Sequence, residues 1–98
     1  MAQQIEWTPQ ALKDYYAIIV YLEEQWSPQI ADSFLALTEE KLFILAQQPF
    51  LGISSEKEPA VRSILLTKHN RLYYKVENTK LIVLSIFDTR QNPEKENF

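Results

Sequence analysis

Residues 61–87 read VRSILLTKHNRLYYKVENTKLIVLSIF, and this stretch decides the fold class. It contains three runs rich in β-branched, aromatic and aliphatic residues, which occupy positions 61–66, 71–76 and 81–87. The connections 67–70 and 77–80 have the length and the Asn content of hairpin turns. The sequence therefore predicts an antiparallel meander of three strands. Within its middle strand, Leu72, Tyr74 and Val76 should share one face, and Arg71, Tyr73 and Lys75 the other.

The segment before the meander carries two helix-start signals and one short strand signal. Ile5 and Trp7 flank Glu6 in an alternating pattern typical of a half-buried strand. Thr8-Pro9 and Ser27-Pro28 each place a good N-cap residue before a proline suited to the first helical turn. We therefore expect a helical hairpin that follows the first strand.

The two expected helices have recognisable apolar faces. In the first helix, the apolar positions at helical spacing are Leu12, Tyr15, Ile19 and Leu22, with Lys13, Asp14 and Glu24 on the opposite face. In the second, they are Ala31, Phe34, Leu35, Leu42 and Leu45, and the pattern extends to Ala46. The polar stretch from Gly52 to Pro59 lacks periodicity and predicts an exposed loop. The expected order is β-α-α-β-β-β, an α+β domain in which a helical hairpin packs on an antiparallel sheet.

Composition limits the chemistry that this domain can carry. With 98 residues we expect a single domain, residues 1–98, with one core. The absence of Cys excludes disulfides, thiolate nucleophiles and Cys-ligated zinc, and with His69 as the single histidine we expect neither a metal site nor a cofactor. The longest apolar segment, 81–87, is too short to span a bilayer, and the start lacks an export signal, so we expect a cytoplasmic protein without membrane contact.

Charge is distributed unevenly between the two halves of the chain. Overall, 10 basic and 13 acidic residues give a net charge of −3, which argues against a nucleic-acid binder. Residues 1–58 hold three basic and nine acidic residues, a net charge of −6, whereas residues 59–98 hold seven basic and four acidic residues, a net charge of +3. All three arginines, Arg62, Arg71 and Arg90, lie in the sheet half and could converge on one surface, where Arg suits phosphate or carboxylate contacts. Solvated charges on an exposed sheet face are the plainer interpretation.

Four stretches of this chain, in this order, resemble the RelE/ParE family of bacterial toxin–antitoxin toxins, also described as plasmid stabilisation proteins. They are residues 5–11 (IEWTPQA), 45–52 (LAQQPFLG), the pair 61–64 and 70–76 (VRSI and NRLYYKV), and 82–93 (IVLSIFDTRQNP). The resemblance implies a compact toxin that a cognate antitoxin holds inactive by wrapping it. It also implies one of two activities. The RelE-like branch cuts messenger RNA on the ribosome, and the ParE-like branch inhibits DNA gyrase.

The residues present bear on the choice between these branches. Metal-free RNA cleavage needs a base, an acid and cationic stabilisation of the phosphate, and Arg62, Arg71 and Arg90 could supply the stabilisation. RelE-like ribonucleases commonly carry a second basic residue two positions after the first on the same strand, and the position two after Arg62 is Ile64 in this chain. They also commonly carry a Tyr or His near the C-terminus, and this chain has neither after Arg90. His69 has a suitable intrinsic pKa but falls in an expected hairpin turn.

These departures favour a ParE-like toxin that inhibits its target by binding, and leave a ribonuclease and a non-toxic relative as alternatives. For a binding toxin, the expected contact residues for target or antitoxin are Arg62, Arg71, Tyr73, Lys75 and Arg90. Expected partners are an antitoxin, with gyrase or the ribosome and its mRNA as target, and a homo-oligomer is possible. Apolar residues on both faces of the last strand suggest surface that an antitoxin helix or strand would cover.

Overall fold

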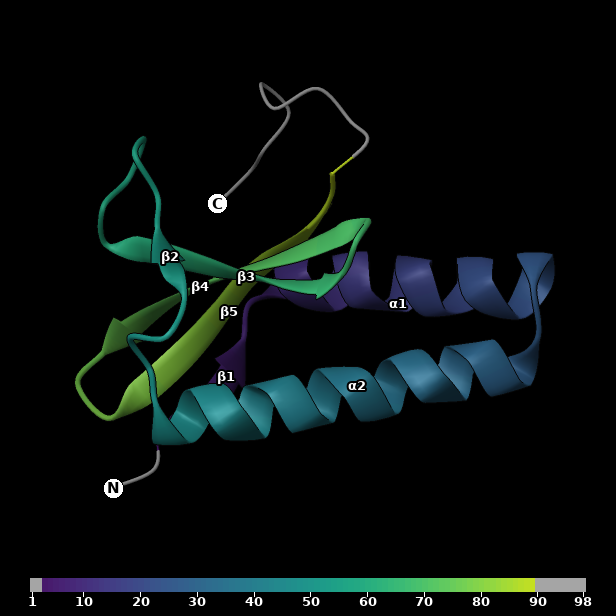
Figure 1. Cartoon of the computed structure of the whole chain (residues 1–98), viewed down its shortest axis with the longest axis horizontal. Helices are drawn as coiled ribbons and strands as arrows, with labels where there is room; N and C mark the ends of the chain where they lie inside the picture. Colours follow the sequence, from purple (N-terminus) through teal and green to yellow (C-terminus); the bar gives the residue numbers. More distant parts are fainter. Residues whose placement is uncertain (1–2, 90–98) are drawn as a thin grey trace.

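The chain folds into two helices packed on one face of a five-stranded mixed sheet (Figure 1). The computed structural model describes residues 3–89. Its elements are β1 (Gln4–Trp7), α1 (Pro9–Gln25), α2 (Pro28–Gln47), β2 (Ile53–Ser54), β3 (Val61–Thr67), β4 (Asn70–Glu77) and β5 (Lys80–Asp88). The strand order is β1-β5-β4-β3-β2. The predicted α+β class, helical hairpin and three-stranded meander are confirmed, and each meander strand is slightly longer than its apolar run.

Both predicted helix starts are confirmed. Thr8 Oγ1 accepts a hydrogen bond from the Ala11 N–H (3.1 Å), and Ser27 Oγ accepts one from the Ile30 N–H (3.1 Å). These side chains satisfy amide groups that have no partner within the first turn of a helix. In the hairpin turn after β4, Asn78 has a φ of 56°, a left-handed conformation that Asn tolerates better than most residues.

Two sheet features differ from the expectation. β1 joins the sheet parallel to β5, with Ile5 beside Leu81 and Trp7 beside Val83, so the sheet is mixed. The stretch expected to be only an exposed loop contains β2, which pairs antiparallel with β3 and forms the other edge of the sheet. The parallel pairing follows because the chain crosses the whole helical layer between β1 and β5.

The core lies between the helical hairpin and one sheet face. Its fully buried members include Leu45 from α2, Leu72 and Tyr74 from β4, and Leu81 and Val83 from β5. The face predicted for α2 is confirmed for Ala31, Phe34, Leu42, Leu45 and Ala46, which are buried, whereas Leu35 is only partly buried. The face predicted for α1 is partly wrong. Ala11, and not Leu12, is the buried residue in its first turn, and Leu12 is 38% exposed.

Asp14 also departs from its predicted place on the solvent face of α1. Its Oδ2 accepts a hydrogen bond from the Ile86 backbone N–H of β5 (3.0 Å). Thr8 Oγ1 donates to the Leu84 carbonyl of the same strand (2.9 Å). β1 pairs only with the first half of β5, up to Val83, so these side chains satisfy backbone groups on the second half of that strand edge. Leu84 is the extra residue of a bulge, because Tyr73 pairs with Ser85 and Tyr74 with Val83.

Candidate functional site

The middle strand presents a basic strip on the sheet face that points away from the helices. This strip consists of Arg71, Tyr73 and Lys75, which share a face as predicted. Arg71 Nη1 donates to Ser63 Oγ (2.8 Å), and Lys75 Nζ lies 2.8 Å from a Glu77 carboxylate oxygen. Tyr73 is buried, so its ring contributes more to packing than to an open stacking surface.

Arg62 lies on the opposite face of the sheet. Strand register places it beside Tyr74, a core residue, whereas its neighbour Ser63 pairs with Tyr73 on the outer face. Arg62 Nη1 donates to the carbonyls of Gly52 (2.8 Å) and Phe50 (3.3 Å), and its guanidinium lies 5.2 Å from the centre of the Phe50 ring. The structure therefore does not bring Arg62 and Arg71 to one surface. Side-chain alternation sends them to opposite faces, and Arg90 lies outside the described residues.

Tyr74 and Gly52 complete the contacts that hold the turn after α2. The Tyr74 hydroxyl donates to the Pro49 carbonyl (2.8 Å) and accepts from the Gly52 N–H (2.9 Å). Burial raises the pKa of Tyr74, while the Gly52 hydrogen bond and the positive charge of Arg62 act in the opposite direction. We call residues 49–52, held by Tyr74 and Arg62, the clamped turn. Sequence reasoning missed it because Tyr74 carried no signal beyond its core-facing position.

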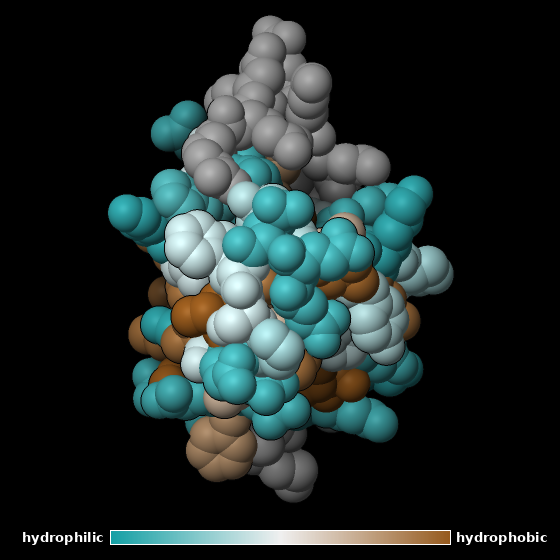
Figure 2. All heavy atoms as spheres, turned by 90° about the vertical axis from the view of Figure 1, so that its right-hand side faces the viewer, coloured by the Kyte–Doolittle hydropathy of each residue, from teal (hydrophilic) through white to brown (hydrophobic). Residues whose placement is uncertain are grey.

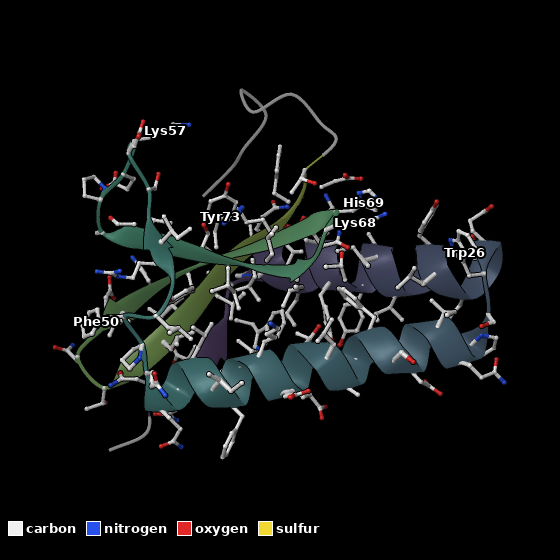
Figure 3. The ribbon with its side chains drawn as sticks, viewed as in Figure 1. Trp26, Phe50, Lys57, Lys68, His69 and Tyr73 are labelled. Carbon is white, nitrogen blue, oxygen red and sulfur yellow. The ribbon has the colours of Figure 1, made fainter. Side chains whose placement is uncertain are left out.

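His69 lies in the two-residue turn between β3 and β4, as predicted. Its N–H donates to Thr67 Oγ1 (3.2 Å), and its carbonyl accepts from the Thr89 N–H (2.9 Å). Both bonds use the His69 backbone and fix the turn. His69 lines a large groove at the end of the molecule where the helical hairpin extends past the sheet (Figure 3).

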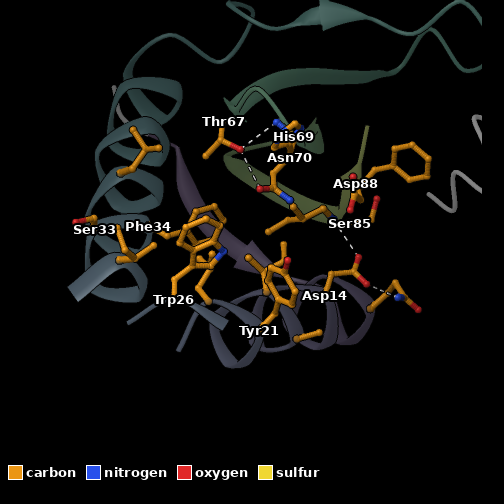
Figure 4. Close-up of a pocket in the computed structure, with 18 residues that line it drawn as sticks. Asp14, Tyr21, Trp26, Ser33, Phe34, Thr67, His69, Asn70, Ser85 and Asp88 are labelled. Atoms are coloured by element: carbon orange, nitrogen blue, oxygen red, sulfur yellow. Dashed lines mark hydrogen bonds between the residues drawn. The ribbon is translucent and has the colours of Figure 1, made fainter. Parts of the chain in front are cut away.

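This groove has a volume of about 830 Å³. Its walls come from α1, α2, the β3–β4 turn and the end of β5 (Figure 4). The lining residues are Gln10, Asp14, Ala17, Ile18, Tyr21, Leu22, Trp26, Ile30, Ser33, Phe34, Leu37, Thr67, His69, Asn70, Ser85, Ile86, Phe87 and Asp88. They include aromatic and aliphatic side chains and two carboxylates, and no Lys or Arg.

Several groove residues are large apolar side chains left open to solvent. Trp26 is 70% exposed at the end of α1, and Tyr21 and Ile30 are about half exposed. Figure 2 looks onto this end, where brown apolar atoms lie among teal polar ones. No sequence pattern predicted that these residues form a groove. The available signal was that Tyr21 and Ile30 are apolar but lie off the core-facing rows of their helices.

Beyond the groove and the basic strip, the described part of the chain shows no further candidate site. Residues 3–89 contain no group of three or more metal-ligating side chains, and neither helix has the length and hydropathy of a bilayer-spanning segment. The two candidate surfaces of this small α+β domain are therefore the groove at one end and the basic strip on the outer face of the sheet.

Several solved structures share this fold. A chromosomal ParDE system from P. aeruginosa matches with a TM-score of 0.74 and 23% identity, covering 89% of this chain and 96% of that chain. A YoeB/ParE toxin from Agrobacterium tumefaciens matches with a TM-score of 0.65 and 15% identity, covering 88% and 98%. The toxin–antitoxin complex RelBE2 from Mycobacterium tuberculosis matches with a TM-score of 0.63 and 18% identity, covering 90% and 99%. Among curated proteins, none matches the chain.

The sequence model of the ParE toxin of the type II toxin–antitoxin system parDE matches residues 5–93. The chain therefore belongs to the ParE toxin family. The resemblance found in the sequence is confirmed.

Proposed function

We propose that this ParE-family toxin acts by binding a protein target of the DNA gyrase class, and not by cutting RNA. The observation that supports this choice is the separation of Arg62 and Arg71. Arg62 and Arg71 project from opposite faces of the sheet, and each is hydrogen-bonded within the fold. A scissile phosphate needs cationic groups that converge on it. His69, the one histidine of the chain, lies in a turn at the groove end of the molecule.

A supercoiling assay with purified DNA gyrase tests this proposal. We expect the chain to inhibit supercoiling, and its induced expression to stop growth with signs of blocked DNA replication. Messenger RNA ends mapped in the same cultures distinguish the alternative activity. New cleavage sites together with unimpaired gyrase would show that the chain is a ribonuclease and not a binding toxin. Normal growth would indicate a non-toxic relative.

We further propose that the groove receives a segment of the cognate antitoxin. The supporting observations are its size, its exposed apolar walls and its position between two helices and the sheet end. A groove of this kind suits an amphipathic helix whose apolar side chains enter it. Burying Trp26, Tyr21 and Ile30 would remove exposed apolar surface from water. Each Å² of apolar surface removed stabilises the complex by about 25 cal/mol.

Co-expression with the neighbouring open reading frame tests the antitoxin site. We expect Ile30→Glu to weaken co-purification of the antitoxin strongly, because it places a charge in an apolar wall. Phe43→Glu is the matched control, because Phe43 is an exposed apolar residue of α2 that does not line the groove. If both variants co-purify as much antitoxin as the wild type does, the groove is not the antitoxin site.

A further inference from the structure

Helix α1 carries a second apolar row that the fold does not cover. Leu12, Tyr16 and Val20 are spaced four residues apart, so they lie along one side of the helix with about 6 Å between successive positions. They are 38%, 63% and 47% exposed, respectively. The residues of α1 that pack into the core lie on a different side, beginning with the fully buried Ala11.

Opposite charges lie near the two ends of this row. Lys13 is in the first half of α1 and Glu24 is near its end, and both are exposed. They are eleven residues apart, which is about three helical turns, so they project from the same flank of the row. Among the residues described, 3–89, no ion pair involves either side chain.

This charge arrangement is complementary to itself in one orientation. If two α1 helices pair antiparallel with Tyr16 opposite Val20 of a second copy, Lys13 lies level with Glu23 of that copy and one residue from Glu24. The two-fold symmetry repeats the contact at the other end. Parallel pairing in register would instead place the charged flanks of the two copies on opposite sides of the interface, where Lys13 and Glu24 do not meet.

We propose that two copies of this chain associate through α1, antiparallel, with the row Leu12, Tyr16 and Val20 as the apolar centre and Lys13–Glu24 pairs at its edges. A pair of single helices buries less than the roughly 1,200 Å² that is typical of a stable interface. The dimer is therefore weak and depends on concentration. It leaves the antitoxin groove open, because that groove uses the side of α1 that carries Asp14, Ala17 and Tyr21.

Sedimentation velocity on the purified full chain over a range of concentrations tests the proposal. We expect a monomer–dimer equilibrium for the wild type, and Tyr16→Glu to remain monomeric at every concentration that dimerises the wild type. Tyr21→Glu is the control for a new charge on an exposed tyrosine of the same helix, and it should dimerise like the wild type. A wild type that stays monomeric up to about millimolar concentration would overturn the proposal.

A charge exchange tests the orientation with variants that keep the apolar row. Lys13→Glu and Glu24→Lys should each raise the dimer dissociation constant at least about fivefold, because each turns two attractive pairs into repulsive ones. The double variant should return it to within about twofold of wild type, and Glu40→Lys on α2 should not change it. If the double variant is as weak as the single variants, the antiparallel pairing is wrong.

Discussion

Gly52 is the one glycine of the chain, and it lies where a side chain has no space. A Cβ at this position would come within 2.5 Å of the Tyr74 hydroxyl oxygen and 2.9 Å of the Ser63 carbonyl oxygen. This close approach lets the Gly52 N–H reach the Tyr74 hydroxyl. At the residue scale, the clamped turn is therefore built from a missing side chain, a buried phenol and the Arg62 guanidinium.

Gly52→Ala should lower the free energy of unfolding by about 1–3 kcal/mol, because the added methyl group must displace well-packed atoms. Urea denaturation measures the loss. Leu51→Ala, at an exposed position of the same turn, should change stability by less than about 0.5 kcal/mol. Adding Tyr74→Phe to Gly52→Ala should recover part of the loss, since it removes the nearest clashing atom. Wild-type stability of Gly52→Ala would contradict this packing.

Tyr74 should also make the fold sensitive to alkali. Burial raises the pKa of this phenol in the folded state above its ordinary value of about 10. The folded chain therefore favours the neutral phenol, and this contribution to stability is present below pH 10 and is lost as the pH rises through the folded-state pKa. Thermal unfolding between pH 8 and 11 should show stability falling above pH 10.

Tyr74→Phe provides the comparison for this pH profile. It should be less stable than wild type near neutral pH, because two hydrogen bonds are lost, and its stability should fall less steeply above pH 10. Tyr15 also has a pKa raised mainly by burial, so a residual slope is expected in this variant. Parallel profiles for the two proteins would show that Tyr74 does not contribute.

At the scale of elements, the first half of α1 serves as the cover of an open strand edge. Asp14 accepts from Gln10 Nε2 (2.8 Å) and from the Ile86 N–H (3.0 Å), so one carboxylate connects the helix to the second half of β5. An aspartate near a helix start is ordinary, and its use on a neighbouring strand depends on where the helix is placed.

Asp14→Ala should destabilise the fold by about 1–2 kcal/mol, because it leaves the partly buried Ile86 N–H without its acceptor. Amide hydrogen exchange at Ile86 should become faster. Asp14→Asn keeps a carbonyl acceptor and should retain most of the stability and protection, while Asp32→Ala, at an exposed position of α2, should be close to neutral. Unchanged exchange at Ile86 in Asp14→Ala would contradict the assigned contact.

The two N-cap residues should contribute differently to stability, although each has a hydroxyl that caps a helix and each is followed by a proline. Ser27→Ala should lose about 1 kcal/mol, the usual contribution of an N-cap. Thr8→Ala should lose more, because Thr8 Oγ1 also donates to the Leu84 carbonyl. Thr8→Ser keeps the hydroxyl and serves as the control. Chemical denaturation of the three variants measures the order, and a larger loss at Ser27 would contradict it.

At the scale of the whole molecule, Arg62 and Arg71 of the basic half of the sequence do not share one surface. Arg62 is drawn to the clamped turn on the core-facing side, and Arg71 is held by Ser63 on the outer side. The acidic helical half meanwhile provides the groove and the exposed apolar row of α1.

The separation of the arginines predicts additive effects on stability. Arg62→Ala should be destabilising, because two carbonyls of the clamped turn lose their donor, and Arg71→Ala should be milder. The double variant should equal the sum of the single variants within about 0.5 kcal/mol, because the two side chains share no partner. A larger coupling energy in the double-mutant cycle would indicate that the two guanidinium groups act on a common site.

The three meander strands, their turns and both helix starts were predictable because their signals are local, whereas β2 was missed. Thr8-Pro9 and Ser27-Pro28 fix amide groups within one turn, and alternation along 71–76 assigns Arg71, Tyr73 and Lys75 to one face without knowledge of the neighbours. The face of α1 was less predictable, since Leu12 and Ala11 are adjacent apolar residues. The choice between them depends on the angle at which the sheet meets the helix.

The sequence by itself determined the α+β class, the helical hairpin, the meander and the family, because periodicity, capping and motif order are properties of neighbouring residues. Only the tertiary structure decided which faces Arg62 and Arg71 use, that Asp14 and Thr8 cover the edge of β5, and that Tyr21, Trp26 and Ile30 meet the end of the sheet in a groove. These features join residues far apart in the chain. The physical reason is that their contacts exist only once the hairpin has packed on the sheet and set the distances between them.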